Sequence, residues 1–303
     1  MRNTVPTARL SGRTAIVTGA SRGMGKAIAL AFACEGAAVA VVARSETQWN
    51  ERLPGTIHET VAEIEAAGGR AVAVAADLSN LDEVDVAYAA ARETLGPIDL
   101  LVNNAALTVP GRPMKPGEQR PAPRAADAAI IAVSQSTKPA APFGSFLSFP
   151  LSGFQRHFTV GLFASYRLMQ LVLPDMLEVG RGSIVNISSV AGLIPGEGPY
   201  TSDPGMRPVA YGGNKAALHH LTQCVAAEMQ QHGVAVNVLT PSEPILTPGN
   251  LYASAGETNW ADADDFAEAA IRVALVDAQV TTGQILWDHD VLHPDLPKRG
   301  WLR

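Results

Sequence analysis

Short apolar runs alternate with longer amphipathic stretches along most of the chain. The apolar runs are Thr14–Thr18, Ala38–Val42, Ala71–Ala75, Leu100–Val102, Ser183–Ile187 and Ala235–Leu239. The stretches with helical spacing are Lys26–Cys34, Ile57–Ala67, Leu81–Leu95, Phe154–Val179 and Tyr211–His232. Strands that are buried on both faces are continuously apolar, and helices between them make the crossovers of a parallel sheet. The pattern therefore predicts an α/β fold with one doubly wound parallel sheet in a three-layer α/β/α arrangement.

Two segments depart from this alternation. Residues 107–153 contain eight prolines and four glycines, and only Ala125–Val133 within them has helical character. Residues 195–208 are a second segment rich in proline and glycine. Long segments of this kind are typical of lids or disordered insertions. We expect a single domain over residues 1–303 with these two insertions. The longer insertion either covers a cleft and shapes substrate choice, or it is a solvated segment or an oligomer contact. The polar end, Asp290–Arg303, is expected on the surface.

Composition narrows the classes of function. The 303 residues are 47% hydrophobic and 17% charged, with a formal net charge of -6 and two cysteines. A chain of this kind can bury a large core, and its acidity argues against a nucleic-acid partner. The two cysteines lie in separate helical stretches, which does not indicate a disulfide framework. The sequence has neither a leader-like start nor an apolar run long enough to cross a membrane. We therefore expect a cytoplasmic protein. His157, His219 and His220 have no partners at metal-ligand spacing, which assigns them to ordinary helix faces and predicts no metal.

A glycine-rich loop follows the first predicted strand and opens the first helix. It is Thr18–Gly25, TGASRGMG. Gly19, Gly23 and Gly25 let the chain turn sharply and let backbone N–H groups approach a pyrophosphate, to which the helix N-terminus adds favourable partial charge. The loop residues expected at the cofactor are Gly19, Ser21, Arg22, Gly23, Met24 and Gly25. A loop like this alone is also compatible with a tight turn, but its position in an alternating pattern predicts a Rossmann-type dinucleotide site.

The end of the second strand indicates which dinucleotide binds. An acidic residue there would bind the ribose 2′-OH of NAD, but the chain has Ala43 and Arg44 instead. Arg22 and Arg44 would suit bidentate hydrogen bonds to a 2′-phosphate, which favours NADP(H). The alternative is that Arg44 is a solvated loop residue. Further along the chain, Asp77 and Leu78 are expected beside the adenine, with Asn103 and Asn104 closing the cofactor cleft.

Tyr211 and Lys215 form the candidate catalytic pair. Side chains at i and i+4 share one face of a helix. A phenol with a pKa of about 10 needs a shift of about three units, or about 4 kcal/mol, to act as a base at neutral pH. A nearby ammonium and a positive nicotinamide ring are expected to supply it. Ser189, at the end of the strand SIVNI, is expected to donate a hydrogen bond to the substrate oxygen, with Ser188 as the alternative.

These motifs, in this order, resemble the short-chain dehydrogenase/reductase family from about Ser11 to Trp287. The matching residues are Thr18–Gly25, Asp77, Asn103–Ala105, Asn186–Ser189, Tyr211, Lys215, Pro241, Thr247 and Thr282–Gln284. The resemblance implies an oxidoreductase that interconverts a carbonyl and a secondary alcohol, with Tyr211 as acid/base and Ser189 as oxygen donor. Lys215 would bind the nicotinamide ribose and lower the pKa of the tyrosine. Further cofactor contacts are expected from Asn104, Ala105, Pro241, Ile245 and Thr247.

The same resemblance implies a homodimer or homotetramer built on the helices that begin near Phe154 and Tyr211. The stretch Leu53–Glu65 further resembles hydroxysteroid-dehydrogenase-like members of the family. The small-molecule substrate itself is not indicated.

The chain departs from the family pattern at several positions. Gly161 stands where the family's helix usually supplies an asparagine that helps to hold a water for proton relay to the lysine. Glycine cannot do this, so either a backbone carbonyl and water substitute or turnover is impaired. Ala106 and Ser242 replace glycines of the family motifs. The alternative function is therefore a non-catalytic or weakly active NADP(H)-binding protein, whereas an enoyl reductase would need a wider Tyr-to-Lys spacing.

Overall fold

The computed structural model describes residues 7–108, 146, 149–194, 196–197, 208–253 and 260–298. Most of the 107–153 segment, including the expected helix at Ala125–Val133, lies outside the described residues, as does most of the 195–208 segment. The expected single domain with two insertions therefore stays a prediction.

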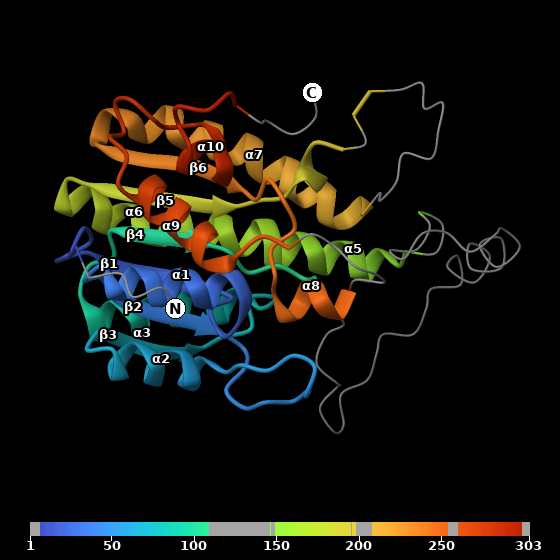
Figure 1. Cartoon of the computed structure of the whole chain (residues 1–303), viewed down its shortest axis with the longest axis horizontal. Helices are drawn as coiled ribbons and strands as arrows, with labels where there is room; N and C mark the ends of the chain where they lie inside the picture. The colour runs from blue at the N-terminus through green and yellow to red at the C-terminus, as the bar shows by residue number, and fades with distance from the viewer. Residues whose placement is uncertain are drawn as a thin grey trace, which may run out of the picture.

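The described residues form one seven-stranded parallel sheet in the order β3-β2-β1-β4-β5-β6-β7 (Figure 1). The strands are β1 (Thr14–Thr18), β2 (Ala38–Ala43), β3 (Arg70–Ala75), β4 (Leu100–Asn103), β5 (Gly182–Ile187), β6 (Val234–Thr240) and β7 (Ile285–Trp287). From β1 the chain first adds β2 and β3 on one side of the sheet. It then returns, so that β4 pairs with β1 on the other side, where β5, β6 and β7 follow. This reversal is the topological switch point at which doubly wound folds bind ligands.

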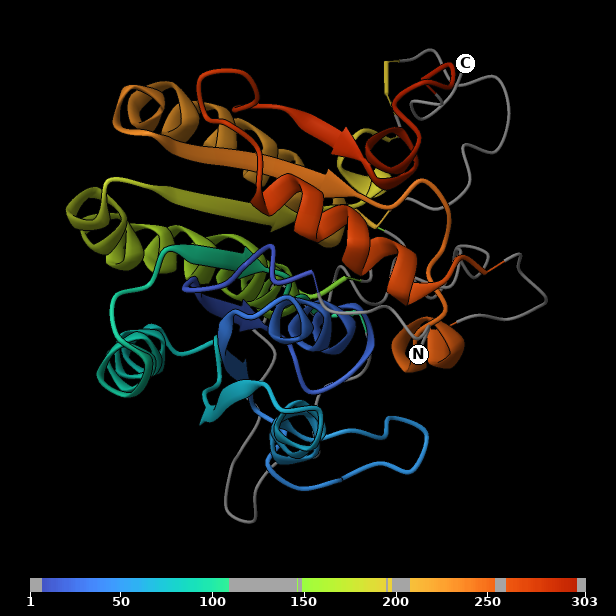
Figure 2. The ribbon, with the colours of Figure 1, turned by 60° about the vertical axis from the view of Figure 1, so that its left-hand side comes forward.

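Helices cover both faces of the sheet and make the three expected layers (Figure 2). On one face lie α1 (Gly23–Cys34), α2 (Ile57–Ala66), α9 (Ala263–Ala274) and α10 (Asp288–Leu292). On the other lie α3 (Leu81–Leu95), α6 (Ala164–Val179) and α7 (Val209–Met229). Two shorter helices, α5 (Leu151–Phe158) and α8 (Pro248–Ala253), stand near the ends of the strands.

Each inner strand contributes to two separate cores. In β1, Ala15 and Val17 pack in the core under α1 and α9, whereas Ile16 packs in the core under α3 and α6. All three side chains have no exposed surface. This is why the strands are continuously apolar rather than alternating: successive side chains point to opposite faces, and both faces are covered.

The predicted elements are present, and the differences lie at their ends. Helix α1 begins at Gly23, three residues before the predicted start. The predicted helix Phe154–Val179 is α5 and α6 joined by a π-helical turn at Thr159–Phe163. The sequence patterns did not identify α8, α9, β7 or α10. Of the expected surface segment at the C-terminal end, residues 294–298 are exposed, while Val291 and Leu292 pack against the core.

Among the described residues, no helix has the length and hydropathy needed to cross a membrane.

Candidate active site

The carboxyl ends of the parallel strands meet at one edge of the sheet, which is the right-hand edge in Figure 1. The starts of α1 and α7, together with α5 and α8, lie along this edge. Every residue that the sequence motifs singled out for cofactor or catalysis therefore comes from a segment that begins or ends here. This common origin follows from the parallel sheet, which places the ends of all its strands side by side.

The glycine loop between β1 and α1 is packed tightly against the end of β4. Gly19 and Gly23 have φ angles of +68° and +57°, a region that favours glycine. Asn104 Nδ2 donates to Thr18 O at 2.8 Å, and the Asn104 backbone N–H donates to Thr18 Oγ1 at 3.0 Å. An ideal Cβ at Gly25 would overlap Gly19 O and Asn104 Nδ2. The loop therefore needs glycine at these positions.

Arg44 lies close enough to Arg22 to act on its charge. The pKa of Arg22 is lowered, first by burial and then by the positive charge of Arg44. The Arg22 guanidinium donates to Ser45 Oγ at 3.0 Å, to Gly55 O at 2.9 Å and to Pro54 O at 3.2 Å. Arg22 is thus held by the loop between β2 and α2, so its side chain is already ordered.

Arg44 is held less firmly. Its NH1 lies 3.6 Å from Asp77 Oδ2, which is an ion pair but not a good hydrogen bond. Asp77 also accepts hydrogen bonds from the backbone N–H and the hydroxyl of Ser79, at 2.9 and 2.7 Å. Burial raises the pKa of Asp77, but the Ser79 hydrogen bonds and the charge of Arg44 outweigh it, so the net pKa is lowered. The Leu78 side chain is 5% exposed and packs into the core under α3, so only its backbone is placed to face a ligand.

The segment after β6 comes back against the glycine loop. Thr247 is buried, and an ideal Cβ at Gly23 would lie 3.3 Å from its Cβ. Thr247 Oγ1 accepts from the backbone N–H of Asn250 at 3.1 Å and so caps α8. Ile245 is also buried, and Pro241 is half-buried. The structure therefore brings the expected cofactor residues of β1–α1 and of β6–α8 together.

A chain of buried amides connects β4, β5 and α7 beneath the site. Asn103 Nδ2 donates to Asn186 Oδ1 at 2.8 Å, and these two residues are register partners. Asn186 Nδ2 in turn donates to Thr222 Oγ1 at 2.9 Å. This polar chain fixes α7 relative to the ends of the two central strands, and so fixes the height of Tyr211 and Lys215.

The two serines after β5 face different partners. Ser189 is hydrogen-bonded to Tyr211 through the two side chains. Ser188 is 2% exposed, and its Oγ lies 2.6 Å from His219 Nε2. Burial, followed by the charge of Lys215, lowers the pKa of His219 to about 4, so His219 is neutral at pH 7. The structure therefore places Ser189, rather than Ser188, beside the phenol.

Lys215 is buried behind the phenol ring. Its side chain is among the largest fully buried ones, and its Nζ donates to Ile187 O at 2.7 Å. The same nitrogen lies 5.7 Å from the centre of the Tyr211 ring. Burial lowers the pKa of Lys215 to about 8. The amine is thus still mainly protonated at neutral pH, and its position is fixed by the end of β5.

The pKa of Tyr211 moves in the opposite direction from the expected one. Burial raises it, and the hydrogen bond with Ser189 lowers it by less, so the net pKa lies above the ordinary value. The resemblance implied that Lys215 lowers this pKa. In the structure burial is the largest influence because the phenolate would lose much of its hydration.

Two histidines that the sequence assigned to ordinary helix faces lie at the site. His219 contacts Ser188 as described, and the His157 ring of α5 meets the edge of the Tyr211 ring at a centroid distance of 6.4 Å. Burial lowers the pKa of His157. His220 is exposed and lies 3.5 Å from Cys224 Sγ. His219 stands four residues after Lys215, and this spacing places both side chains on the same face of α7. The sequence therefore carried a signal that His219 lies near the site.

No group of three or more metal-ligating side chains is present in the part of the chain that the structure describes.

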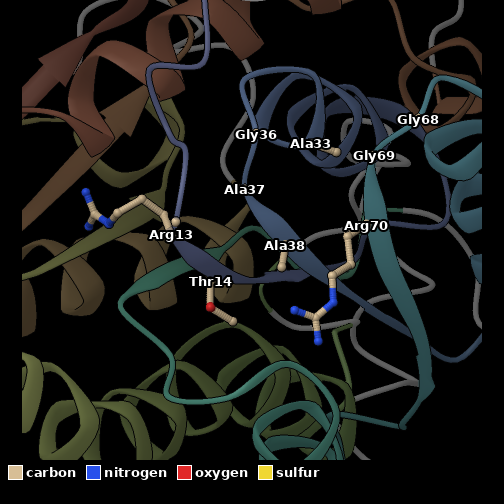
Figure 3. A pocket seen from close by; sticks show the side chains of 10 residues that line it. Arg13, Thr14, Ala33, Gly36, Ala37, Ala38, Gly68, Gly69 and Arg70 are labelled. Carbon is tan, nitrogen blue, oxygen red and sulfur yellow. The ribbon is translucent and has the colours of Figure 1, made fainter.

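A separate hollow of about 460 Å³ lies at the amino-terminal edge of the sheet (Figure 3). Its two charged side chains already have partners. Arg13 forms an ion pair with Asp99, and Arg70 donates to Thr94 O at 2.8 Å. Ligands of doubly wound sheets bind at the opposite, carboxyl edge. The hollow is therefore not the candidate active site.

Comparison with known proteins identifies relatives with a similar sequence and fold. A family model for short chain dehydrogenase matches residues 13–142 and 127–255. Ketoacyl reductase HetN from Nostoc sp. is 31% identical over 232 residues, which are 77% of this chain, and the chain spans only 63% of that protein. L-rhamnose 1-dehydrogenase (NAD(P)(+)) from Sphingomonas sp. is 32% identical over 243 residues, covering 80% of this chain and 76% of that protein. A solved 7α-hydroxysteroid dehydrogenase complexed with NADH and 7-oxo glycochenodeoxycholic acid is 27% identical, with a TM-score of 0.68 and coverage of 94% of this chain and 95% of that chain.

Proposed function

Because the chain belongs to the short-chain dehydrogenase family, we propose that it is an NADP(H)-dependent oxidoreductase that interconverts a carbonyl and a secondary alcohol by hydride transfer. The observation that carries this proposal is the pairing of the Tyr211 phenol with Ser189, with the Lys215 ammonium buried behind the ring.

The residues present fit a nicotinamide dinucleotide. An added Cβ at Gly23 or Gly25 would meet Thr247 or the Gly19 backbone, so the loop offers backbone rather than side chains to a bound group. When bound, the cofactor supplies or accepts the hydride. The chain's own residues then orient the substrate oxygen and handle the proton.

In the reducing direction, Tyr211 holds the proton at its phenol oxygen and transfers it to the substrate oxygen as the carbonyl carbon receives hydride. The Ser189 hydroxyl donates a hydrogen bond to the same oxygen and stabilises its developing charge. Lys215, fixed by Ile187 O, favours the phenolate that remains. In the oxidising direction the same phenolate accepts the proton of the alcohol. The raised pKa of Tyr211 means that the resting form is the protonated phenol, which is the form that reduction requires.

The preference for NADP(H) is inferred from charge. Burial and the neighbouring Arg44 both disfavour the Arg22 cation, and a phosphate between the two guanidiniums would relieve this repulsion. Strand β2 ends without a carboxylate that would repel the phosphate. Relatives of the chain are described with NAD(P)(+) and with NADH, so the choice depends on these two arginines.

A homodimer or homotetramer is supported by an apolar groove between the helices expected to form the interface. It is lined by Leu162, Phe163, Tyr166, Ala217, His220, Leu221 and Cys224, and its solvent-accessible surface is apolar. Phe163 and Tyr166 are each 47% exposed, which is unusual for large aromatic side chains that have no partner molecule. Light scattering after size-exclusion chromatography should give two or four times the chain mass, and Phe163→Glu should give a smaller assembly. A monomer for the unchanged chain would contradict the proposed assembly.

The enzymatic proposal is tested by following NADPH oxidation at 340 nm (absorbance of the reduced nicotinamide) with a panel of ketones and aldehydes. Removing the acid/base group should lower kcat by about a hundredfold or more in Tyr211→Phe. The matched control is Tyr166→Phe, which removes a phenol oxygen from an exposed residue of α6 and should keep the parent rate. Equal rates for Tyr211→Phe and the parent chain would remove Tyr211 from the mechanism and favour the non-catalytic alternative.

A further inference from the structure

Three consecutive residues at the end of β5 contact three successive turns of α7. In strand order, the pairs are Ile187 with Lys215, Ser188 with His219 and Ser189 with Tyr211. The three helix residues are spaced by four positions, so they lie on one face of α7. The proposed mechanism uses the first and the third pair, and it assigns no task to the second.

The second pair is buried, and its contact is short. Ser188 is 2% exposed and His219 is 6% exposed. Ser188 Oγ lies 2.6 Å from His219 Nε2, which is within hydrogen-bond distance. The backbone N–H of Ser188 donates to Leu239 O of β6 at 2.9 Å. Ser188 is therefore held from two sides, by the sheet through its backbone and by α7 through its hydroxyl.

The same imidazole lies against the far end of the turn that follows Ser189. Gly192 ends the short 3₁₀ turn Val190–Gly192, and its backbone N–H donates to Ser189 O at 2.9 Å. An ideal Cβ on Gly192 would lie 3.0 Å from His219 Cε1 and 3.1 Å from Lys215 Cβ, which is tighter than most contacts of real Cβ atoms. The His219 ring therefore fills the space beside this turn, and glycine lets the turn approach the ring closely.

Ser189 lies between these two contacts of the imidazole. Its Oγ accepts a hydrogen bond from the backbone N–H of Ala191 at 3.2 Å, so the serine proton is left for a hydrogen bond that Ser189 donates. The direction of that bond depends on where the turn sits, because the side chain is tied to the backbone of the turn. A donor stabilises developing charge only when it points at the position of the reacting oxygen. A contact that fixes the turn therefore fixes this donor.

We propose that His219 is a positioning residue that acts through Ser189. Its imidazole binds the Ser188 hydroxyl on one side of Ser189 and packs against Gly192 on the other, and it thereby fixes the direction in which the Ser189 hydroxyl points. The inference rests on the proposed function, because that function assigns Ser189 its task as oxygen donor. Burial and the charge of Lys215 keep the pKa of His219 low, so the ring holds the turn without adding a second positive charge.

The first test removes the imidazole. His219→Leu keeps an apolar side chain in the buried space but makes no hydrogen bond, so kcat should fall about 10-fold, while KM for NADPH should stay within about twofold. His219→Gln supplies both a donor and an acceptor, which suits either tautomer of the parent ring, and should keep kcat within about threefold of the parent. The matched control is His232→Leu, which removes an exposed imidazole from the turn after α7 and should keep the parent kcat. A parent kcat for His219→Leu, or an equal loss in His219→Gln, would contradict the proposal.

A second perturbation reaches the same turn from Gly192. In Gly192→Ala the new methyl group would press on the imidazole and on the stem of Lys215, so the turn should shift and kcat should fall about 10-fold. This variant keeps both side chains of the second pair, so it tests the proposal even if His219→Leu does not fold. Ser188→Ala keeps the ring against Gly192 and should lower kcat less than either variant. A parent kcat for Gly192→Ala would contradict the proposal.

Double variants decide whether these losses pass through Ser189. In a chain that already carries Ser189→Ala, neither His219→Leu nor Gly192→Ala should lower kcat further, because the hydroxyl that they misplace is gone. A buried pair that only stabilises the fold would give the same fold loss in both backgrounds. Equal losses with and without the Ser189 hydroxyl would therefore overturn the inference.

Crystal structures of the full chain give a readout that does not depend on turnover. In the parent the Ser189 hydroxyl should be hydrogen-bonded to Tyr211, and in His219→Leu this hydrogen bond should be lost while Tyr211 keeps its position. An unchanged Ser189 in His219→Leu would overturn the inference. If Ser189 moves as expected but neither Ser189→Ala nor Tyr211→Phe lowers the rate of carbonyl reduction, it is the proposed function that fails.

Discussion

Replacing Arg44 by alanine tests the cofactor assignment most directly. The structure separates the two candidate arginines. Arg22 already donates to Ser45, Pro54 and Gly55, whereas Arg44 has only an ion pair of 3.6 Å with Asp77 among its described contacts. Arg44 therefore has donors available for a 2′-phosphate, and most of the discrimination between NADPH and NADH should come from it.

The size of the effect follows from the exposure of the side chain. A hydrogen bond to a charged group contributes about 1.5–3 kcal/mol, which corresponds to about 10- to 150-fold in kcat/KM. The Arg44 side chain is 38% exposed, so solvent screening places the expected loss near the lower limit. We expect kcat/KM for NADPH to fall about 10- to 30-fold in Arg44→Ala, and kcat/KM for NADH to stay within about twofold.

The assay is initial-rate kinetics with both cofactors at fixed substrate and fixed ionic strength. Arg70→Ala is the matched control, because it removes the same charge at the opposite edge of the sheet, where Arg70 bonds only Thr94 O among its described contacts. An equal loss with NADH and NADPH, or a parent enzyme that uses NADH better, would refute the reasoning from Arg44. A loss in Arg70→Ala would show that net charge, rather than contact, sets the preference.

Three further predictions concern the loop, the lysine and the serines. In Gly25→Ala the new Cβ overlaps the Gly19 backbone, so fluorescence titration should show lost NADPH binding and calorimetry should show a lower Tm. The control is Gly213→Ala, whose Cβ would meet Phe158 at an ordinary 3.5 Å. It should keep the NADPH affinity and the Tm of the parent. Lys215→Met should abolish turnover yet raise the free energy of unfolding in urea at pH 6, with a much smaller gain at pH 10. The sign follows because burial lowers the pKa of Lys215 from 10.5 to about 8, so the folded chain is destabilised by the charged amine below pH 8, and this penalty fades as pH rises from 8 to 10.5. Ser189→Ala should lower kcat about 100-fold with little change in Tm. Ser188→Ala removes the hydroxyl that contacts His219, so it should lower Tm more than kcat. The reverse pattern would assign the role of oxygen donor to Ser188 instead of Ser189.

Local patterns were enough to predict six of the seven strands of the described sheet. A strand buried on both faces has a continuous apolar sequence, and β1, β2 and β5 were recognised within one residue at each end for this reason. The glycine loop could be placed because the φ angles of Gly19 and Gly23 require that residue. By contrast, β7 has only three residues and depends on pairing with β6, so its own sequence carries little signal.

Contacts between distant segments could not be read in the same way. Leu78 follows a strand, like other site residues, but its side chain turns into the core, which depends on how α3 packs. Nothing near Arg22 in sequence indicates that residues 45–55 would bind its guanidinium. The close approach of Gly161 to Asn214 joins positions on facing helices that lie far apart in the chain.

The pKa shifts of Tyr211 and Lys215 show why neither side chain explains the chemistry alone. Burial opposes charge on both: it raises the pKa of the phenol and lowers that of the amine to about 8. Once the phenol has given up its proton, however, a phenolate and an ammonium face each other across 5.7 Å, measured from the ring centre. In a buried site, opposite charges this near attract each other and favour the phenolate. The attraction exists only when both groups are charged, so it stabilises the state after proton transfer and not the resting state. A neutral lysine above pH 8 would remove it, and the lysine must therefore be held in place and kept hydrogen-bonded for the tyrosine to act.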